Sequence, residues 1–397
     1  MDPVDPGAPQ PFAPARLGPI ELRNRIIKAA TFEGMSPDGL VTDELIRFHA
    51  QMAEGGVGMT TLAYVAVSPD GRGAPAELVI DDRVGDGLAR LVDAVHAEGA
   101  KVSAQLGHAG AVGEMPGKRP VGPSPMRTAT GAKVRQIGSD ELDEVVADFA
   151  EGARVLVAAG FDAIELHFGH HYLVSSFMSP RWNRRRDEYG DGTEGRALLA
   201  RRILRAVGAA VGPSVAVVAK LNMTDAVRGG LEPAESIRIA TLLESDSVLH
   251  AIELSAGGSL RNQMFMFRGP APRKDLATVL TPVQGWGLRM LGPLVMRGYP
   301  FEEAYLLPMA RQFRRQLDLP LILLGGINEL ATVRSAIAEG FEFVAMGRAL
   351  LREPDLVDRW SRGRADDSSC IHCNRCMVSV FSGTRCVIDH PDAPDIR

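Results

Sequence analysis

Short apolar runs alternate with longer stretches of mixed polarity along most of the chain. Eight of these runs have the length and composition of buried strands, and several, such as VAVVAKL and LILL, are almost continuously apolar. Continuous apolar runs are typical of parallel strands that are buried on both faces. The predicted strands are residues 25–30, 59–67, 101–106, 161–166, 215–221, 250–254, 320–324 and 342–346.

The stretches between these runs have helical periodicity. Ser139 stands where a helix N-cap is expected, and after it apolar side chains recur at intervals of three and four positions, namely Leu142, Val145, Val146, Phe149, Ala153 and Leu156. Eight strand–helix units over roughly 330 residues favour a (β/α)8 TIM barrel over an open, doubly wound sheet. We therefore predict an N-terminal arm (residues 1–20), a barrel (residues 21–355) and a short cysteine-bearing C-terminal tail (residues 356–397).

Three segments that follow predicted strands are long, namely residues 107–138, 167–193 and 255–300. In a barrel, all such segments lie at the carboxyl end of the strands, where active sites are built. The insert at 255–300 contains the run Met-Phe-Met-Phe-Arg at 264–268. This insert either lines a substrate pocket or packs on the barrel or on another subunit.

The overall composition excludes several classes of protein. Of the 397 residues, 45% are hydrophobic and 23% are charged, which permits a large core and excludes general disorder. The net charge of −5 argues against nucleic acid or an anionic membrane as the main partner, and no apolar run is long enough to span a bilayer. We expect a cytoplasmic protein without a secretory signal that acts on small molecules.

The most informative segment for chemistry begins at the end of the fourth predicted strand. His167 follows that strand, His170 lies three residues further on, and Tyr172 two beyond it. Two imidazoles and a phenol at one strand end can bind a carbonyl or nitro oxygen and supply a proton. Alternatively, these are ordinary loop and packing residues, or His167, His170 and His171 hold zinc in a metal hydrolase.

The same segment resembles the fourth-strand motif of the old yellow enzyme family of FMN-dependent oxidoreductases. In that family a strand ending in Glu-x-His is followed by His or Asn, then Tyr-Leu, then Ser-Pro-x-x-Asn-x-Arg-x-Asp-x-Tyr-Gly. The resemblance extends over residues 11–390. The matching positions here are Glu165, His167, His170, Tyr172, Leu173, Ser179, Pro180, Asn183, Arg185, Asp187, Tyr189 and Gly190.

The resemblance implies that this chain binds FMN and uses NAD(P)H as its reductant. Several positions depart from the usual family pattern: Ala30-Thr31 stands where a proline is common, Lys220 where arginine is frequent, Gly195 where asparagine is frequent, and Asp191 where a second glycine follows Tyr189. In having a lysine at position 220, the chain resembles the branch that includes 2,4-dienoyl-CoA reductase and trimethylamine dehydrogenase. The cofactor-binding residues that the resemblance implies are Ala30, Thr31, Gln105, Lys220, Gly325, Gly326, Gly347 and Arg348.

All four cysteines lie in the tail, in a C-x2-C-x2-C-x9-C pattern formed by Cys370, Cys373, Cys376 and Cys386. Four thiolates at short spacing can bind a [4Fe–4S] cluster or a structural zinc ion, and free thiols are the third interpretation. The related branch carries an iron–sulfur cluster directly after its barrel. A cluster here would either pass electrons to an outside partner protein or be structural.

The expected activity is the reduction of an activated C=C bond. His167 and His170 would hold the carbonyl oxygen of the substrate, and Tyr172 would protonate its α-carbon. The alternative is an oxidative dehydrogenase or demethylase whose electrons leave through the iron–sulfur cluster. We also expect a homo-oligomer.

Overall fold

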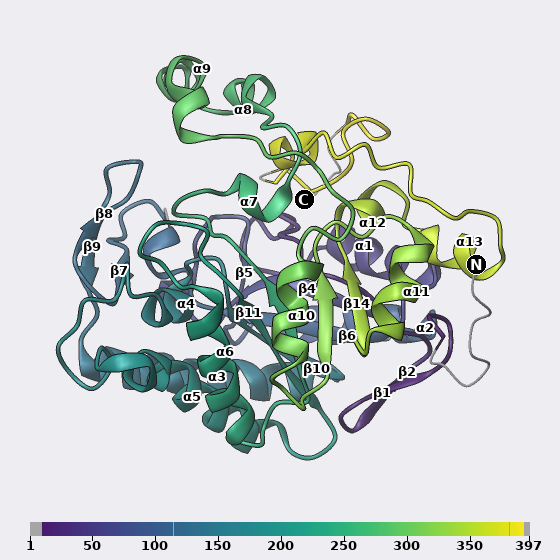
Figure 1. Ribbon diagram of the computed structural model, residues 1–397, viewed down its shortest axis with the longest axis horizontal. Helices are drawn as coiled ribbons and strands as arrows, with labels where there is room; N and C mark the ends of the chain where they lie inside the picture. The colour runs from purple at the N-terminus through teal and green to yellow at the C-terminus, as the bar shows by residue number, and fades with distance from the viewer. Residues whose placement is uncertain (1–9, 114, 381, 393–397) are drawn as a thin grey trace.

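The computed structural model describes residues 10–113, 115–380 and 382–392, and it contains a closed barrel of eight parallel strands (Figure 1). The order around the barrel follows the chain, and the first strand pairs with both the second and the last. The predicted (β/α)8 barrel is confirmed, and each strand begins and ends within two residues of its predicted run. The strands are β3 (Ile26–Lys28), β4 (Met59–Ala66), β6 (Lys101–Gly107), β10 (Ala163–Phe168), β11 (Ala216–Asn222), β12 (Ala251–Ser255), β13 (Leu321–Leu324) and β14 (Phe343–Met346).

Helices surround this barrel and bury their apolar sides against it. One detail of the prediction is wrong: Gly138, not Ser139, is the N-cap of α3, and the Glu141 carboxylate accepts the Gly138 N–H at 2.9 Å. The surrounding helices are α1 (Asp43–Glu54), α2 (Gly85–Ala97), α3 (Ser139–Ala158), α5 (Gly192–Val211), α6 (Pro233–Ser245), α10 (Leu307–Arg314), α11 (Leu330–Ala338), α12 (Arg348–Arg352) and α13 (Leu356–Ser361).

A two-stranded hairpin, β1 (Ala15–Leu17) and β2 (Ile20–Leu22), covers the amino end of the barrel strands. Its side chains Leu17 and Leu22 are fully buried against the first residues of the strands, including Ala163 and Phe343. This end is filled by apolar packing. Residues 1–9 of the predicted N-terminal arm lie outside the described residues.

The carboxyl end of the barrel carries the additional elements. Figure 1 shows the helical pair α8–α9 standing above the barrel, with the C-terminal tail crossing nearby. Tail and barrel are joined by hydrogen bonds, among them Thr384 N–H to the Glu33 carbonyl at 2.8 Å. Within the described residues, no helix is long and apolar enough to cross a membrane. The additional elements are η1 (Pro69–Gly71), β5 (Leu78–Val79), η2 (Gly110–Val112), β7 (Val121–Gly122), β8 (Met126–Arg127), β9 (Lys133–Gln136), α4 (Leu173–Met178), α7 (Met264–Phe267), α8 (Arg273–Val279), α9 (Pro282–Val295) and η3 (Arg375–Val378).

Candidate active site

A cavity of about 310 Å³ opens at the carboxyl ends of the barrel strands. Every catalytic and cofactor-binding residue predicted from the sequence lines it, although these residues come from six of the eight strands and the loops after them. Met266 and Phe267 of the long insert also line this cavity, as does Cys376 of the tail. The eleven predicted residues are His167, His170, Tyr172, Ala30, Thr31, Gln105, Lys220, Gly325, Gly326, Gly347 and Arg348.

The two histidines and the tyrosine form a compact group in the cavity. The ring centroids of His167 and His170 lie 5.1 Å apart, and those of His167 and Tyr172 lie 4.5 Å apart. His170 adopts a left-handed backbone conformation, with φ of +61°, and its N–H donates to Asn222 Oδ1 at 3.1 Å. Its Nε2 lies 2.6 Å from the Ser255 hydroxyl. The local backbone and Ser255 together hold this imidazole in place.

The protonation states of this group follow from its burial. Burial lowers the pKa of His167 well below its usual range, and the neighbouring His170 and Lys220 lower it further. Burial, together with the charge of Lys220, also lowers the pKa of His170 to about 3. The pKa of Tyr172 is raised, chiefly by burial and then by the charge of Glu77. At neutral pH the site therefore holds two neutral imidazoles and a protonated phenol.

Tyr64 belongs to this group and was missed in the sequence analysis. Its ring centroid lies 5.2 Å from that of Tyr172 and 6.1 Å from that of His167. The Tyr64 hydroxyl donates to the Gly71 carbonyl at 3.2 Å. The available signal was its position: Tyr64 is the tyrosine near the end of an otherwise mostly aliphatic predicted strand, the end at which barrel active sites are built.

Lys220, which lines the cavity, is the centre of a buried ionic group. Its Nζ lies 3.0 Å from Glu165 Oε1 and 3.0 Å from Glu253 Oε1, and all three side chains are at most 3% exposed. Gln105 donates to the same Glu165 oxygen at 2.6 Å. Burial by itself lowers the pKa of Lys220, but the two carboxylates reverse this effect and raise it above its usual value. Burial raises the pKa of Glu253 to about 8.

The opposite end of the cavity has the features of a phosphate site. Gly325 and Gly326 have φ values of +108° and +75°, and a Cβ atom on Gly326 would lie 2.5 Å from the Tyr305 ring. Only glycine suits this close turn. The Thr31 hydroxyl is buried and has no hydrogen-bond partner among the described residues, and a Cβ atom on Gly347 would lie 3.4 Å from the Thr31 methyl group. A glycine cradle with an unpartnered hydroxyl fits the phosphate of FMN, with Arg348 as the nearby cation.

The three histidines expected of a metal hydrolase do not come together. His171 does not line the cavity that contains His167 and His170. Instead, it is fully buried, with its Nε2 3.3 Å from Asp225 Oδ1 and its ring centroid 5.4 Å from that of Trp182. The left-handed conformation at both His170 and His171 turns the two neighbouring side chains in different directions.

The four tail cysteines line a second, small cavity of about 20 Å³. All four thiols are free, and within the described parts of the chain no group of three or more His, Cys, Asp or Glu side chains is arranged to hold a metal ion. Cys376 borders both this cavity and the larger one with the histidines. Burial raises the pKa of its thiol to about 11. The predicted metal site stays a prediction.

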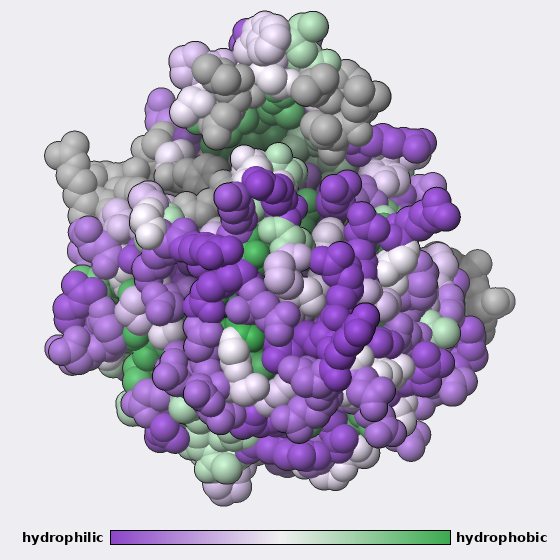
Figure 2. All heavy atoms as spheres, turned by 90° about the vertical axis from the view of Figure 1, so that its left-hand side faces the viewer, coloured by the Kyte–Doolittle hydropathy of each residue, from purple (hydrophilic) through white to green (hydrophobic). Residues whose placement is uncertain are grey.

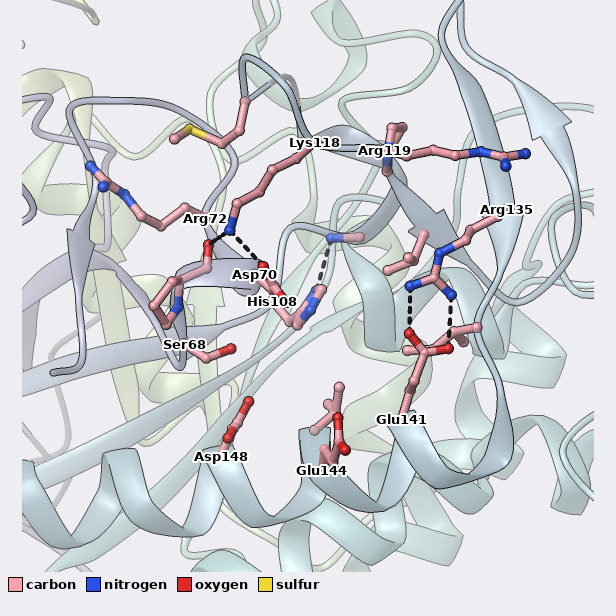
Figure 3. Close-up of a pocket in the computed structure, with 18 residues that line it drawn as sticks. Ser68, Asp70, Arg72, His108, Lys118, Arg119, Arg135, Glu141, Glu144 and Asp148 are labelled. Atoms are coloured by element: carbon pink, nitrogen blue, oxygen red, sulfur yellow. Dashed lines mark hydrogen bonds and ion pairs between the residues drawn. The ribbon is translucent and has the colours of Figure 1, made fainter.

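A larger cavity, of about 510 Å³, contains none of the predicted site residues. Figure 3 shows Glu141, Glu144 and Asp148 pointing into it from α3, opposite basic side chains on the facing loops. Several charges of its wall are already neutralised: Arg135 Nη1 lies 2.7 Å from Glu141 Oε2, and Lys118 Nζ lies 2.5 Å from Asp70 Oδ1. Its size alone does not make it the active site.

Comparisons with known proteins identify the family of this chain. The NADH:flavin oxidoreductase / NADH oxidase family matches residues 10–255. The chain is 52% identical to a 4,4'-dithiodibutanoate disulfide reductase of Rhodococcus erythropolis, over 96% of each protein. It is 32% identical to an NADH oxidase of Thermoanaerobacter brockii, over 92% of this chain but only 53% of that relative. The chain thus spans about half the length of the second relative.

Solved structures show the same fold at lower sequence identity. A 2-naphthoyl-CoA reductase in complex with 2-naphthoyl-CoA has a TM-score of 0.82 and 23% identity, covering 96% of this chain and 56% of that one. Morphinone reductase in complex with tetrahydroNAD has a TM-score of 0.73 and 23% identity, covering 97% of both chains. This chain belongs to the NADH:flavin oxidoreductase / NADH oxidase family, which is the old yellow enzyme family, and is an FMN-dependent oxidoreductase that uses NADH or NADPH.

Proposed function

We propose that this enzyme reduces the activated C=C bond of α,β-unsaturated carbonyl compounds with NAD(P)H. The observation that carries the proposal is the convergence of His167, His170 and Tyr172 on the cavity that also holds Lys220 and the Gly325–Gly326 cradle. FMN bound in this cavity would supply the hydride. The protein side chains then have two tasks, namely to bind the carbonyl oxygen and to deliver a proton.

His167 and His170 bind the carbonyl oxygen in this proposal. Because both imidazoles are neutral, each offers one N–H donor. His170 Nε2 lies 2.6 Å from the Ser255 hydroxyl; when that hydroxyl donates to Nε2, the N–H of Nδ1 is the donor left for the substrate oxygen. Hydrogen bonds of this kind strengthen as negative charge develops on the oxygen, and each contributes about 3 kcal/mol to the transition state.

Tyr172 supplies the proton to the α-carbon. Its raised pKa keeps the phenol protonated at neutral pH, and its ring packs against that of His167 at 4.5 Å between centroids. The proton donor therefore stands beside the group that binds the oxygen. Tyr64 packs against Tyr172, with 5.2 Å between ring centroids, and helps to fix the position of the Tyr172 ring.

Reduction of an organic disulfide is a second candidate reaction. It is favoured by the 52% identity to a 4,4'-dithiodibutanoate disulfide reductase. In that reaction a hydride and a proton convert one disulfide, RSSR, to two thiols, RSH, while NAD(P)H becomes NAD(P)+. Tyr172 would protonate the leaving thiolate. Both reactions use the same cavity and the same cofactor.

The test compares the two substrates in the wild type and in the Tyr172→Phe variant. We expect wild-type turnover of 2-cyclohexenone, and a decrease in its kcat of about 10²–10⁴-fold in Tyr172→Phe. Reduction of the bound flavin by NAD(P)H, followed by absorbance, should be unchanged. Tyr299→Phe is the matched control, because Tyr299 donates to Asn262 and does not line the cavity. Turnover of 4,4'-dithiodibutanoate but not of the enone would favour the second candidate.

We further propose that the tail cysteines bind a [4Fe–4S] cluster. Support comes from the four thiols around one cavity and from Cys376, which also borders the flavin cavity. Iron and acid-labile sulfide should each be found at about four per chain in anaerobically purified protein. One zinc per chain would show the structural-zinc alternative instead, and four titratable thiols without metal would show free cysteines. Flavin reduction by an amine, rather than by NAD(P)H, would indicate the oxidative direction.

A further inference from the structure

The helical pair α8–α9 exposes an unusual amount of apolar side chain. Among the residues that the structure describes, six large hydrophobic side chains are exposed, and four of them lie in this hairpin. Trp286 is 67% exposed and Met290 is 62% exposed, one helical turn apart on α9, while Val279 and Leu280 are exposed where α8 ends. Exposed clusters of this kind mark surfaces that bind a partner.

The hairpin stands away from the body of the protein. Figure 1 shows α8 and α9 as the outermost elements on the carboxyl side of the barrel. In the view of Figure 2, hydrophobic residues gather beneath the projection at the top, whereas the barrel surface below is mostly hydrophilic. The hairpin begins six residues after Phe267, which lines the candidate active site.

The charge of the hairpin is opposite to that of the whole chain. Residues 273–297 contain four basic side chains, Arg273, Lys274, Arg289 and Arg297, and one acidic side chain, Asp275. The hairpin therefore carries a net charge of +3, whereas the whole chain carries −5. Asp275 is already paired with Arg375 of the tail at 3.2 Å. Arg289 is exposed between Trp286 and Met290, so that cation and apolar groups share one face.

We infer that the α8–α9 hairpin docks on the surface of an anionic lipid bilayer. A helical segment with an exposed tryptophan, further apolar side chains and adjacent cations is the type that lies in a membrane interface. Electrostatic attraction between such cations and anionic lipid headgroups strengthens binding to the membrane. The hairpin would lie in the interface of the bilayer, with its apolar side chains toward the acyl chains.

A second copy of the chain is a poorer partner for this surface. Two hairpins packed face to face would bring two copies of the same segment of net charge +3 against each other. Outside the hairpin, the exposed large hydrophobic side chains of the described residues are only Ile371 and Ile388, so a second copy offers little apolar surface elsewhere. A lipid surface satisfies the apolar groups and the cations together.

Docking would bring the mouth of the candidate active site to the bilayer, because Met266 and Phe267 connect the cavity to the hairpin. It also revises the expectation drawn from net charge. The net charge is a sum over the whole chain. Salt screens the interaction with a charged membrane within about 8–10 Å, so the charge of the element nearest to the membrane decides whether the protein binds.

The test is binding of the holoenzyme to vesicles. We expect co-sedimentation with vesicles of phosphatidylcholine and phosphatidylglycerol, and a blue shift of tryptophan emission. Trp286 would report this shift, because Trp182 and Trp360 are buried. The double variant Trp286→Ser, Met290→Ser should lower the partition coefficient at least tenfold. Arg289→Gln should lower it about fivefold. Arg334→Gln, which removes an exposed charge from α11, is the matched control and should have no effect.

Two outcomes would overturn the inference. The first is equal recovery of the wild type with anionic vesicles, with pure phosphatidylcholine vesicles and without vesicles, together with unchanged Trp286 emission. The second is a blue shift of Trp286 emission that appears without lipid as the protein concentration rises, together with a dimer detected by light scattering. The Trp286→Ser, Met290→Ser variant would abolish this dimer. That result would assign the hairpin to a second copy.

Discussion

The buried ionic group around Lys220 gives the sharpest prediction about stability. Replacing Lys220 with Met keeps the aliphatic stem but removes the charge that lies 3.0 Å from both Glu165 and Glu253. The two carboxyl groups then face each other in a site where they are at most 3% exposed. Removing one member of a buried ionic group is far more damaging than replacing the whole group.

The expected loss is about 3–5 kcal/mol in the free energy of unfolding at pH 8. At an effective dielectric constant of about 20, each 3.0 Å contact corresponds to roughly 5 kcal/mol of attraction, much of which offsets desolvation. The pKa of Glu253 is already about 8 with Lys220 present and rises further without it. Protonation relieves the repulsion, so the loss should be smaller at pH 5 and grow as the pH rises.

This loss is measured by urea unfolding of the wild type and of Lys220→Met at pH 5 and pH 8. Each measurement is made at two FMN concentrations, which separates a change in FMN affinity from a change in the stability of the protein itself. Lys101→Met is the matched control. The Lys101 side chain is 38% exposed and pairs with Asp162 at 2.7 Å, so its loss should cost only about 0–1 kcal/mol. A Lys220→Met variant within 1 kcal/mol of the wild type at pH 8 would refute the reasoning, as would a loss that does not depend on pH.

Two further predictions concern other buried positions. Burial raises the pKa of Glu77 to about 7. As the pH rises from 4.5 to above 7, the wild type should therefore lose about 3 kcal/mol of unfolding free energy relative to Glu77→Gln, measured by urea unfolding. A difference that is constant with pH would contradict the assignment. Gly326→Ala should weaken FMN binding at least tenfold in fluorescence titrations, because its Cβ meets the Tyr305 ring at 2.5 Å. Gly229→Ala, at a similar φ of +73° in open space, should leave FMN affinity unchanged, and equal effects of the two variants would argue against the clash.

Much of the fold and of the candidate site follows from local patterns in the sequence. Continuous apolar runs specify strands that must be buried on both faces, and their regular alternation with helices leads to a closed parallel barrel. Because all strands of such a barrel point the same way, residues after different strands meet at one end. This rule is why residues as distant in sequence as Thr31, His167 and Arg348 could be assigned to one cavity from the sequence.

Other features depended on contacts between segments that no local pattern specifies. The family motif singled out His170 and not His171, and in the structure His170 lines the cavity whereas His171 does not. The partnership of Glu253 with Lys220 arises from the pairing of β11 with β12, and Tyr64 joins the site through side-chain packing.

The projection of the basic α8–α9 hairpin from the barrel is likewise a property of the tertiary structure. The charge of residues 273–297 can be counted in the sequence, but the exposure of Trp286 and Met290 beside it cannot. The sequence by itself therefore determined the barrel and the end at which its chemistry lies. The tertiary structure decided which side chains face one another there, since that depends on backbone direction and packing between segments that are distant in the chain.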